Sequence, residues 1–209
     1  MGPSAPASNL YASFFKRVLD VALVVLSAPL TLPLVLLFGL LIRRDGGPMF
    51  YSQLRVGKDG KLFRCWKLRS MVANAEERLA EYLRDNPEAN AEWTVHQKLK
   101  DDPRITRIGH FIRCSSIDEL PQLWNVLRGD MSIVGPRPFM PEQQKLYKGN
   151  AYYAMRPGLT GYWQVSQRSE SSFAARAAFD NSYANDLTLL TDVKVVAQTV
   201  GVVLRATGR

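Results

Sequence analysis

The chain has 209 residues, of which 46% are hydrophobic and 22% are charged. This composition excludes a disordered chain and a protein with many membrane spans, and the length suits one domain with a short appendage. The 27 Lys and Arg residues exceed the 19 Asp and Glu residues, so the net charge is +8 and the expected partners are anionic: phosphates, acidic lipids or nucleic acid.

A hydrophobic segment near the N-terminus is the first predicted element. Residues 21–42 carry no charge over 22 positions and are flanked by a basic pair on each side. A straight helix of this length could just cross a hydrocarbon core of about 30 Å. Pro29 and Pro33 lie near its middle, however, and each removes a helical hydrogen bond, so we expect a kink or break there.

Three arrangements are compatible with this segment: a re-entrant helix-break-helix, a kinked span, and a cleaved signal peptide. The basic pairs at both ends favour the re-entrant form, because both ends then lie on the same side of the membrane. Ser27 is expected to bond to carbonyls freed at the break. The signal peptide is disfavoured by the length of the segment and by the lack of a small-residue cleavage site after it.

The next predicted element is a β-hairpin. Residues 50–56 and 62–68 have strand character and flank Gly57-Lys58-Asp59-Gly60, a tetrapeptide rich in turn residues. Residues 43–69 carry eight basic side chains against two acidic ones, which suits a surface close to anionic lipid. Residues 72–93 are mostly charged or Ala and predict a surface helix.

A second, shorter amphipathic helix is predicted from Ser116. Ser116-Ile117-Asp118-Glu119 has the form of a capping box, and apolar residues follow at helical spacing. An acidic pair in a first helical turn is commonly structural, since the helix dipole favours it. The same field would keep a carboxylate ionised, and an ionised carboxylate can attack phosphorus or bind Mg²⁺.

Two loops and a final helix complete the chain. Arg137 lies between Pro136 and Pro138 after a strand-like run, so its backbone is held stiffly, as a bidentate phosphate clamp requires. Arg156 begins a glycine-containing loop that is a weak phosphate motif, because it lacks the Lys-Ser/Thr ending of a P-loop. Residues 187–204 predict an interfacial or packing helix that is too polar to span a membrane.

Together these pieces resemble the bacterial monotopic phosphoglycosyl transferases, which begin exopolysaccharide, O-antigen and glycoprotein glycan assembly. The resemblance runs from residue 16 to the C-terminus and rests on the order and spacing of its motifs. These are residues 16–20, 47–57, 67–71, 118–125, 129–132, 135–138 and 156–161. Ser27-Ala28-Pro29 replaces the more usual Ser-Pro, so the exact position of the break stays open.

The resemblance implies an α/β, mostly α, monotopic membrane protein. Residues 1–15 would be a flexible N-terminus, 16–44 the re-entrant membrane helix, and 45–209 a compact cytosolic catalytic domain with amphipathic interfacial helices and a small β-hairpin. The protein would lie at the bacterial inner membrane, with its catalytic domain on the cytosolic face. Its partners would be anionic lipids and downstream glycosyltransferases, and a homodimer is one oligomeric state that the prediction allows.

The implied reaction transfers a sugar-1-phosphate from a UDP-sugar to undecaprenyl phosphate and releases UMP. The family's catalytic pair falls on Asp118, the nucleophile, and Glu119, with Mg²⁺ as cofactor bound by both. Arg137 is the first candidate for phosphate binding. Arg113, Arg69 and Arg156 are secondary candidates. The pattern as a whole is most similar to members that transfer galactose or glucose 1-phosphate for exopolysaccharide.

Two other classes of protein compete with this interpretation. A membrane-anchored nucleic-acid-binding or scaffold protein would use the same basic excess, but the charge is concentrated beside the anchor and no nucleic-acid-binding motif occurs, so we expect no nucleic-acid partner. A Mg²⁺-dependent phosphohydrolase using Asp118 would release phosphate without a lipid acceptor.

Overall fold

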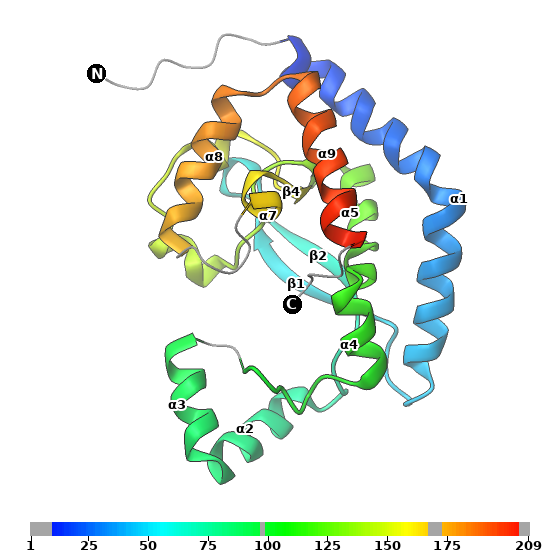
Figure 1. Ribbon diagram of the computed structural model, residues 1–209, viewed down its shortest axis with the longest axis vertical. Helices are drawn as coiled ribbons and strands as arrows, with labels where there is room; N and C mark the ends of the chain where they lie inside the picture. The colour runs from blue at the N-terminus through cyan, green and yellow to red at the C-terminus, as the bar shows by residue number, and fades with distance from the viewer. Residues whose placement is uncertain (1–9, 97–98, 167–172, 205–209) are drawn as a thin grey trace.

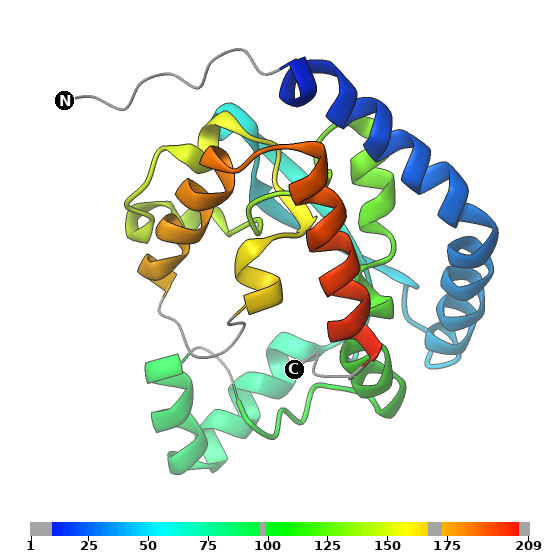
Figure 2. The same ribbon diagram turned by 45° about the horizontal axis from the view of Figure 1, so that its top comes forward.

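The long N-terminal helix α1 (Lys16–Arg43) follows one flank of the molecule in the computed structural model, which describes residues 10–96, 99–166 and 173–204. A π-helical turn, Tyr11–Phe15, leads directly into it, so the helical region begins before the predicted boundary at residue 16. By length and composition, Tyr11–Arg43 could cross a membrane. Figures 1 and 2 both show the helix bent about midway.

The predicted break takes the form of this bend, since α1 stays helical through Pro29 and Pro33. The Ser27 hydroxyl donates to the Val24 carbonyl at 3.0 Å, which is the carbonyl preceding the one that Pro29 deprives of a donor. The re-entrant topology therefore stays a prediction. Most apolar side chains of α1 face away from the protein; the large exposed ones are Val18, Val25, Leu26, Leu30, Leu32, Leu36, Leu37 and Leu40.

Polar contacts fasten the first turns of α1 to the rest of the protein. Lys16 Nζ forms an ion pair at 2.6 Å with the buried Asp192 of α9 (Leu189–Leu204). One turn later, the buried Asp20 accepts hydrogen bonds from the Ser132 hydroxyl at 3.0 Å and the Ile133 amide at 2.9 Å. The apolar helix is therefore held in a defined position against the strand that leads to Arg137.

The hairpin prediction is confirmed with its boundaries: β1 (Phe50–Val56) pairs antiparallel with β2 (Leu62–Leu68). The free edge of β2 is closed by a side chain of α5 (Gln122–Arg128). Fully buried Asn125 accepts from the Trp66 amide at 3.1 Å and donates to the Arg64 carbonyl at 2.7 Å. This side-chain amide acts like a third strand, and it fixes α5 relative to the hairpin.

The predicted surface helix is two helices, α2 (Ala75–Asp85) and α3 (Pro87–His96), separated at Asn86 before a proline. Both lie apart from the main body in Figures 1 and 2. The next helix, α4 (Arg107–Cys114), returns to the body and begins at a Thr106 cap, whose hydroxyl accepts from the Gly109 amide at 2.8 Å.

The capping-box prediction at Ser116 is wrong. Ser116 has a φ of 57°, in the left-handed region, and its side chain forms no cap. Residues Ile117–Glu119 form one turn of 3₁₀ helix, and α5 begins only at Gln122. An N-cap needs extended backbone geometry, which Ser116 lacks because the chain reverses there to leave α4.

A second sheet, which the sequence analysis did not predict, joins the two loop motifs. β3 (Ser132–Val134) pairs in parallel with β4 (Gly158–Thr160). Their glycines permit close backbone approach: a Cβ added to Gly158 would lie 2.1 Å from the Gly135 nitrogen. The glycines of the second loop therefore serve the contact between the two motifs.

The remaining helices, α6 (Ala151–Ala154), α7 (Tyr162–Ser166), α8 (Arg176–Asn185) and α9, complete the fold. The predicted C-terminal helix is confirmed as α9, whose Val195 is buried beside Val134 and Tyr183 while Leu189, Leu190 and Val193 are exposed. The protein is thus mostly helical, as predicted, and has a second small sheet besides the predicted hairpin.

Candidate active site

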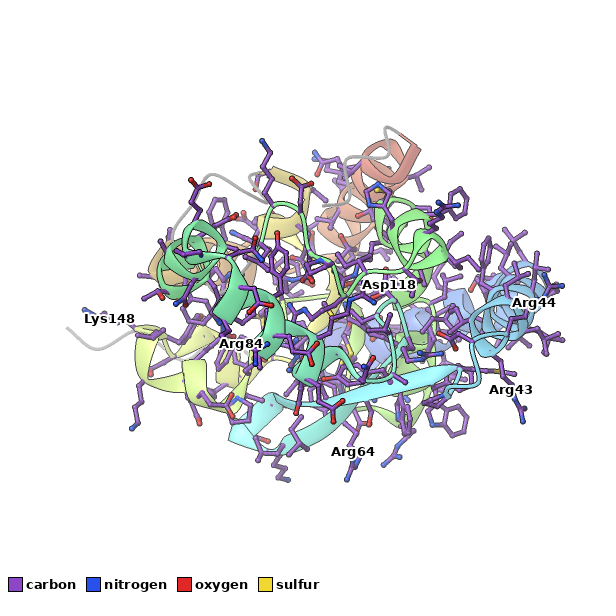
Figure 3. All side chains as sticks on the ribbon, turned by 90° about the horizontal axis from the view of Figure 1, so that it is seen from below. Arg43, Arg44, Arg64, Arg84, Asp118 and Lys148 are labelled. Atoms are coloured by element: carbon purple, nitrogen blue, oxygen red, sulfur yellow. The ribbon has the colours of Figure 1, made fainter. Side chains whose placement is uncertain are left out.

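The acidic pair Asp118 and Glu119 lies on the 3₁₀ turn between α4 and α5. Asp118 is 7% exposed, and Figure 3 shows it within the body of the molecule, whereas Arg43 and Arg44 lie at the end of α1 and Arg64 and Lys148 project outward. The reversal at Ser116 and the Asn125 contact with β2 together bring the pair beside the hairpin.

Lys67 of β2 binds both carboxylates. Its Nζ lies 2.7 Å from Glu119 Oε1 and 3.6 Å from Asp118 Oδ2. The sequence analysis used Lys67 only as part of a motif and did not name it as a site residue. Its register offers a signal, because in β2 Lys67 lies on the same face as the buried Phe63 and Cys65.

Two of the predicted arginines surround the pair. Arg137 Nη2 lies 3.3 Å from Glu119 Oε1, and Arg113 is held by a hydrogen bond from its Nε to the Ser70 hydroxyl at 2.8 Å. Burial raises the pKa of Asp118 from the ordinary carboxyl value, and the charges of Lys67, Arg113 and Arg137 oppose that rise. Burial, not the helix dipole that we expected, is therefore the largest influence on Asp118.

The other two predicted arginines direct their hydrogen bonds to backbone carbonyls. Arg69 is buried and donates to the carbonyls of Pro48 and Met71 at 2.7 and 3.1 Å, and it pairs with Asp45. Arg156 Nε donates to the Gly129 carbonyl at 2.9 Å, at the end of α5. These contacts tie loops to helix ends, and they do not bring either guanidinium to Asp118.

The acidic pair fits a Mg²⁺ ion. The ion commonly binds proteins through one or two carboxylates and takes its other ligands from substrate phosphates and water. In the structure a cationic group, the Lys67 ammonium, lies within 3.6 Å of both carboxylates, so the pair already accommodates a positive charge. Within the described residues no group of three or more His, Cys, Asp and Glu side chains could hold a metal.

The arrangement suits chemistry at a phosphorus atom. A buried carboxylate can act as a nucleophile, while the surrounding cations stabilise negative charge on the non-bridging phosphate oxygens. Side chains that are fixed before substrate binds need little reorganisation in the transition state. Lys67 and Arg137 meet this condition, because both are paired with Glu119.

The sequence of residues 11–206 matches a family described as bacterial sugar transferase. The chain is 48% identical over 197 residues to a UDP-galactose-lipid carrier transferase of Erwinia amylovora, covering 93% of this chain and 41% of that protein. It is 44% identical over 196 residues to the exopolysaccharide production protein ExoY of Sinorhizobium fredii, covering 92% of this chain and 87% of that protein.

A third relative is the UDP-glucose:undecaprenyl-phosphate glucose-1-phosphate transferase of Caulobacter vibrioides, 38% identical over 209 residues, covering 95% of this chain and 73% of that protein. Coverage differs among these relatives. The chain spans about two fifths of the Erwinia protein and most of the Sinorhizobium and Caulobacter proteins.

Proposed function

The chain belongs to the bacterial sugar transferase family, and we propose that it transfers a hexose-1-phosphate from a UDP-sugar to undecaprenyl phosphate, releasing UMP. The observation that carries this proposal is the buried pair Asp118 and Glu119, with Lys67 and Arg137 in direct contact and Arg113 beside it. Transfer of a phosphate-linked group requires a nucleophile and positive charges that stabilise the phosphate oxygens, and a carboxylate with cations around it can supply both.

The names of the relatives support the substrate class. They include a UDP-galactose-lipid carrier transferase, an undecaprenyl-phosphate galactose phosphotransferase and a UDP-glucose-dependent enzyme. We therefore propose galactose or glucose as the sugar. The likeness to ExoY supports a first membrane step of exopolysaccharide synthesis.

The proposed reaction has two displacements at one phosphorus atom. An Asp118 carboxylate oxygen attacks the sugar-bearing phosphorus, the bond to the nucleotide phosphate breaks, and UMP leaves with the bonding electrons. A phosphate oxygen of undecaprenyl phosphate then attacks the same phosphorus and releases the Asp118 carboxylate. A covalent intermediate allows a water-soluble donor and a membrane-bound acceptor to use one site in turn.

The neighbouring side chains have separate roles in this proposal. Arg137 and Arg113 bind non-bridging oxygens, and Lys67 holds Glu119 beside the nucleophile. Mg²⁺, held by Asp118 and Glu119, would neutralise charge on the pyrophosphate. Because Lys67 and Arg137 bind the same Glu119 oxygen, they keep this carboxylate oriented whether or not substrate is present.

The decisive test uses purified protein, a radiolabelled UDP-sugar and Mg²⁺ without lipid acceptor. We expect sugar phosphate to remain covalently on Asp118, and UMP turnover to require undecaprenyl phosphate. Asp118→Asn should fold and neither label nor turn over. The control is Asp59→Asn, because Asp59 lies in the hairpin turn at a φ of 57° that Asn tolerates. Labelling of Asp118→Asn would refute the covalent step, and phosphate release without acceptor would indicate a phosphohydrolase.

We also propose that α1 enters the inner membrane and returns on the cytosolic side. Its bend and its exposed apolar surface support this topology. The test compares Ser8→Cys with Asp59→Cys in a Cys114→Ser background, using a membrane-impermeant thiol reagent on intact cells. Both cysteines should be protected. Labelling at Ser8→Cys alone would establish a membrane span.

A further inference from the structure

A second group of cations adjoins the acidic pair, and its member Arg176 belongs to none of the motifs described above. Arg176, the first residue of α8, stacks on two aromatic rings: its Cζ lies 4.2 Å from the centroid of Trp163 and 4.7 Å from that of Phe173. The Cζ of Arg137 lies 5.9 Å from the same Trp163 centroid. One indole ring therefore has two guanidinium groups against it.

The positive charge of this group is poorly balanced. Arg176 Nε is buried without a hydrogen-bond partner, and within the described part of the chain neither Arg176 nor Arg55 forms an ion pair. Burial, together with the charges of Arg137 and Arg55, lowers the pKa of Arg176 to about 10. Asp180 offsets part of this charge, but its carboxylate is bound to the Tyr147 hydroxyl at 2.7 Å.

A buried Nε–H without an acceptor is costly, and an anion beside the guanidinium would offset the charge that no carboxylate pairs with in the described residues. Stacking on Trp163 and Phe173 holds Arg176 in one orientation, so little side-chain freedom would be lost when that anion arrives. The group is thus prepared for a phosphate.

Arg137 connects this cluster to the acidic pair, since it contacts both Glu119 and the Trp163 ring. A nucleoside diphosphate sugar has two phosphates, and in an in-line displacement the leaving phosphate lies opposite the attacking oxygen. With Asp118 at one phosphorus, the second phosphate must lie on the far side of it. Arg176 adjoins Arg137 across the Trp163 ring and has no carboxylate partner of its own in the described residues.

We propose that Arg176 binds the phosphate that leaves with the nucleotide, while Arg137 lies between the two phosphates of the donor. This inference rests on the proposed function. It makes Arg176 a binding residue for the donor and the nucleotide product, and in the second displacement the acceptor phosphate enters from the side that UMP has left.

The test measures UMP binding and steady-state kinetics on the full chain in detergent. Arg176→Gln and Arg176→Met both remove the charge, and Met also keeps the aliphatic packing on Trp163. The control is Arg84→Gln, because Arg84 is 72% exposed and pairs only with Asp85 in the described residues. In both Arg176 variants we expect the Kd for UMP and the KM for the UDP-sugar to rise at least tenfold. The KM for undecaprenyl phosphate should rise as well, because its phosphate enters the position that UMP has left, whereas Arg84→Gln should leave all three values unchanged.

Wild-type UMP affinity in either folded Arg176 variant would overturn the inference. So would an unchanged KM for the UDP-sugar in a folded variant. Thermal unfolding checks each variant, and if one is unfolded the other decides. Failure of the wild type to transfer sugar phosphate would refute the proposed function instead, and UMP binding does not depend on that transfer.

Discussion

Replacing Asp180 by Asn should change how the stability of this protein depends on pH. Asp180 lies on α8, the helix that carries Arg176, and is 5% exposed. Burial raises its pKa to about 6, although the Tyr147 hydroxyl and the charge of Arg176 both act in the opposite direction. In the unfolded chain the same carboxyl returns to its ordinary value of about 3.9.

The size of the effect follows from this difference. Two pKa units at about 1.4 kcal/mol each give about 3 kcal/mol. Between about pH 4 and pH 6 the folded protein holds a proton on Asp180 that the unfolded chain has lost, so the free energy of unfolding falls as pH rises. Above about pH 6 the carboxyl is ionised in both states, and its contribution is constant. Asp180→Asn removes this slope and keeps an oxygen for the Tyr147 hydroxyl.

The assay is urea unfolding in detergent, followed by tryptophan fluorescence from pH 4 to pH 7.5. Other groups that titrate independently contribute equally to both proteins, so their contributions cancel in the difference in unfolding free energy between wild type and Asp180→Asn. We expect the wild type to lose about 3 kcal/mol relative to the variant across this range. Asp85→Asn is the control, because Asp85 is 64% exposed. A flat difference curve for Asp180→Asn, or one that favours the wild type as pH rises, would refute this account of Asp180.

Two further substitutions test the construction of the site. Lys67→Gln removes the ammonium that binds both carboxylates. Covalent labelling in a single turnover should therefore slow by about 100-fold, the lower end of the range for loss of a preorganised electrostatic contact. Lys61→Gln should label normally, and equal labelling rates in the two variants would remove Lys67 from the site. Gly161→Ala would place a Cβ 2.1 Å from the Gly135 carbonyl oxygen and should lower the free energy of unfolding by about 1–3 kcal/mol, measured by urea unfolding. Gly201→Ala has nothing within 4 Å of the added Cβ and should leave stability nearly unchanged, so similar losses in both variants would contradict the packing argument.

How far the sequence predicts each element depends on the range of the contacts that form it. The hairpin follows from local alternation and a turn, and both strands have the predicted bounds. The parallel pair β3 and β4 has three residues per strand and joins segments more than twenty residues apart. Strands this short show no alternation of apolar and polar residues from which the pairing could be predicted. Ser116 shows the opposite failure, since a local capping pattern was overridden by the reversal that the packing of α4 and α5 requires.

The residues of the candidate site also differ in how far the sequence predicts them. Asp118 and Glu119 are adjacent in the chain, so a motif suffices to find them, and Arg137 is marked by its two prolines. Lys67 reaches the pair only because Asn125 holds α5 against β2, a contact across about sixty residues. A sequence motif records that Lys67 is present, but its role depends on this packing.

The arginines show most clearly why chemistry alone does not identify a binding residue. Arg17, Arg69 and Arg156 all donate to backbone carbonyls near helix or loop ends, where a guanidinium satisfies acceptors that would otherwise be buried without a donor. Such contacts stabilise the fold.

Arg137 and Arg176 differ because both guanidinium groups lie against the Trp163 ring, where Arg137 pairs with the Glu119 side chain and Arg176 forms no ion pair in the described residues. The identity of their hydrogen-bond acceptors separates the two groups of arginines. Under the proposed function, the cations that bind the donor pyrophosphate are therefore those that the Trp163 ring positions, and not those whose donors are bound to backbone carbonyls.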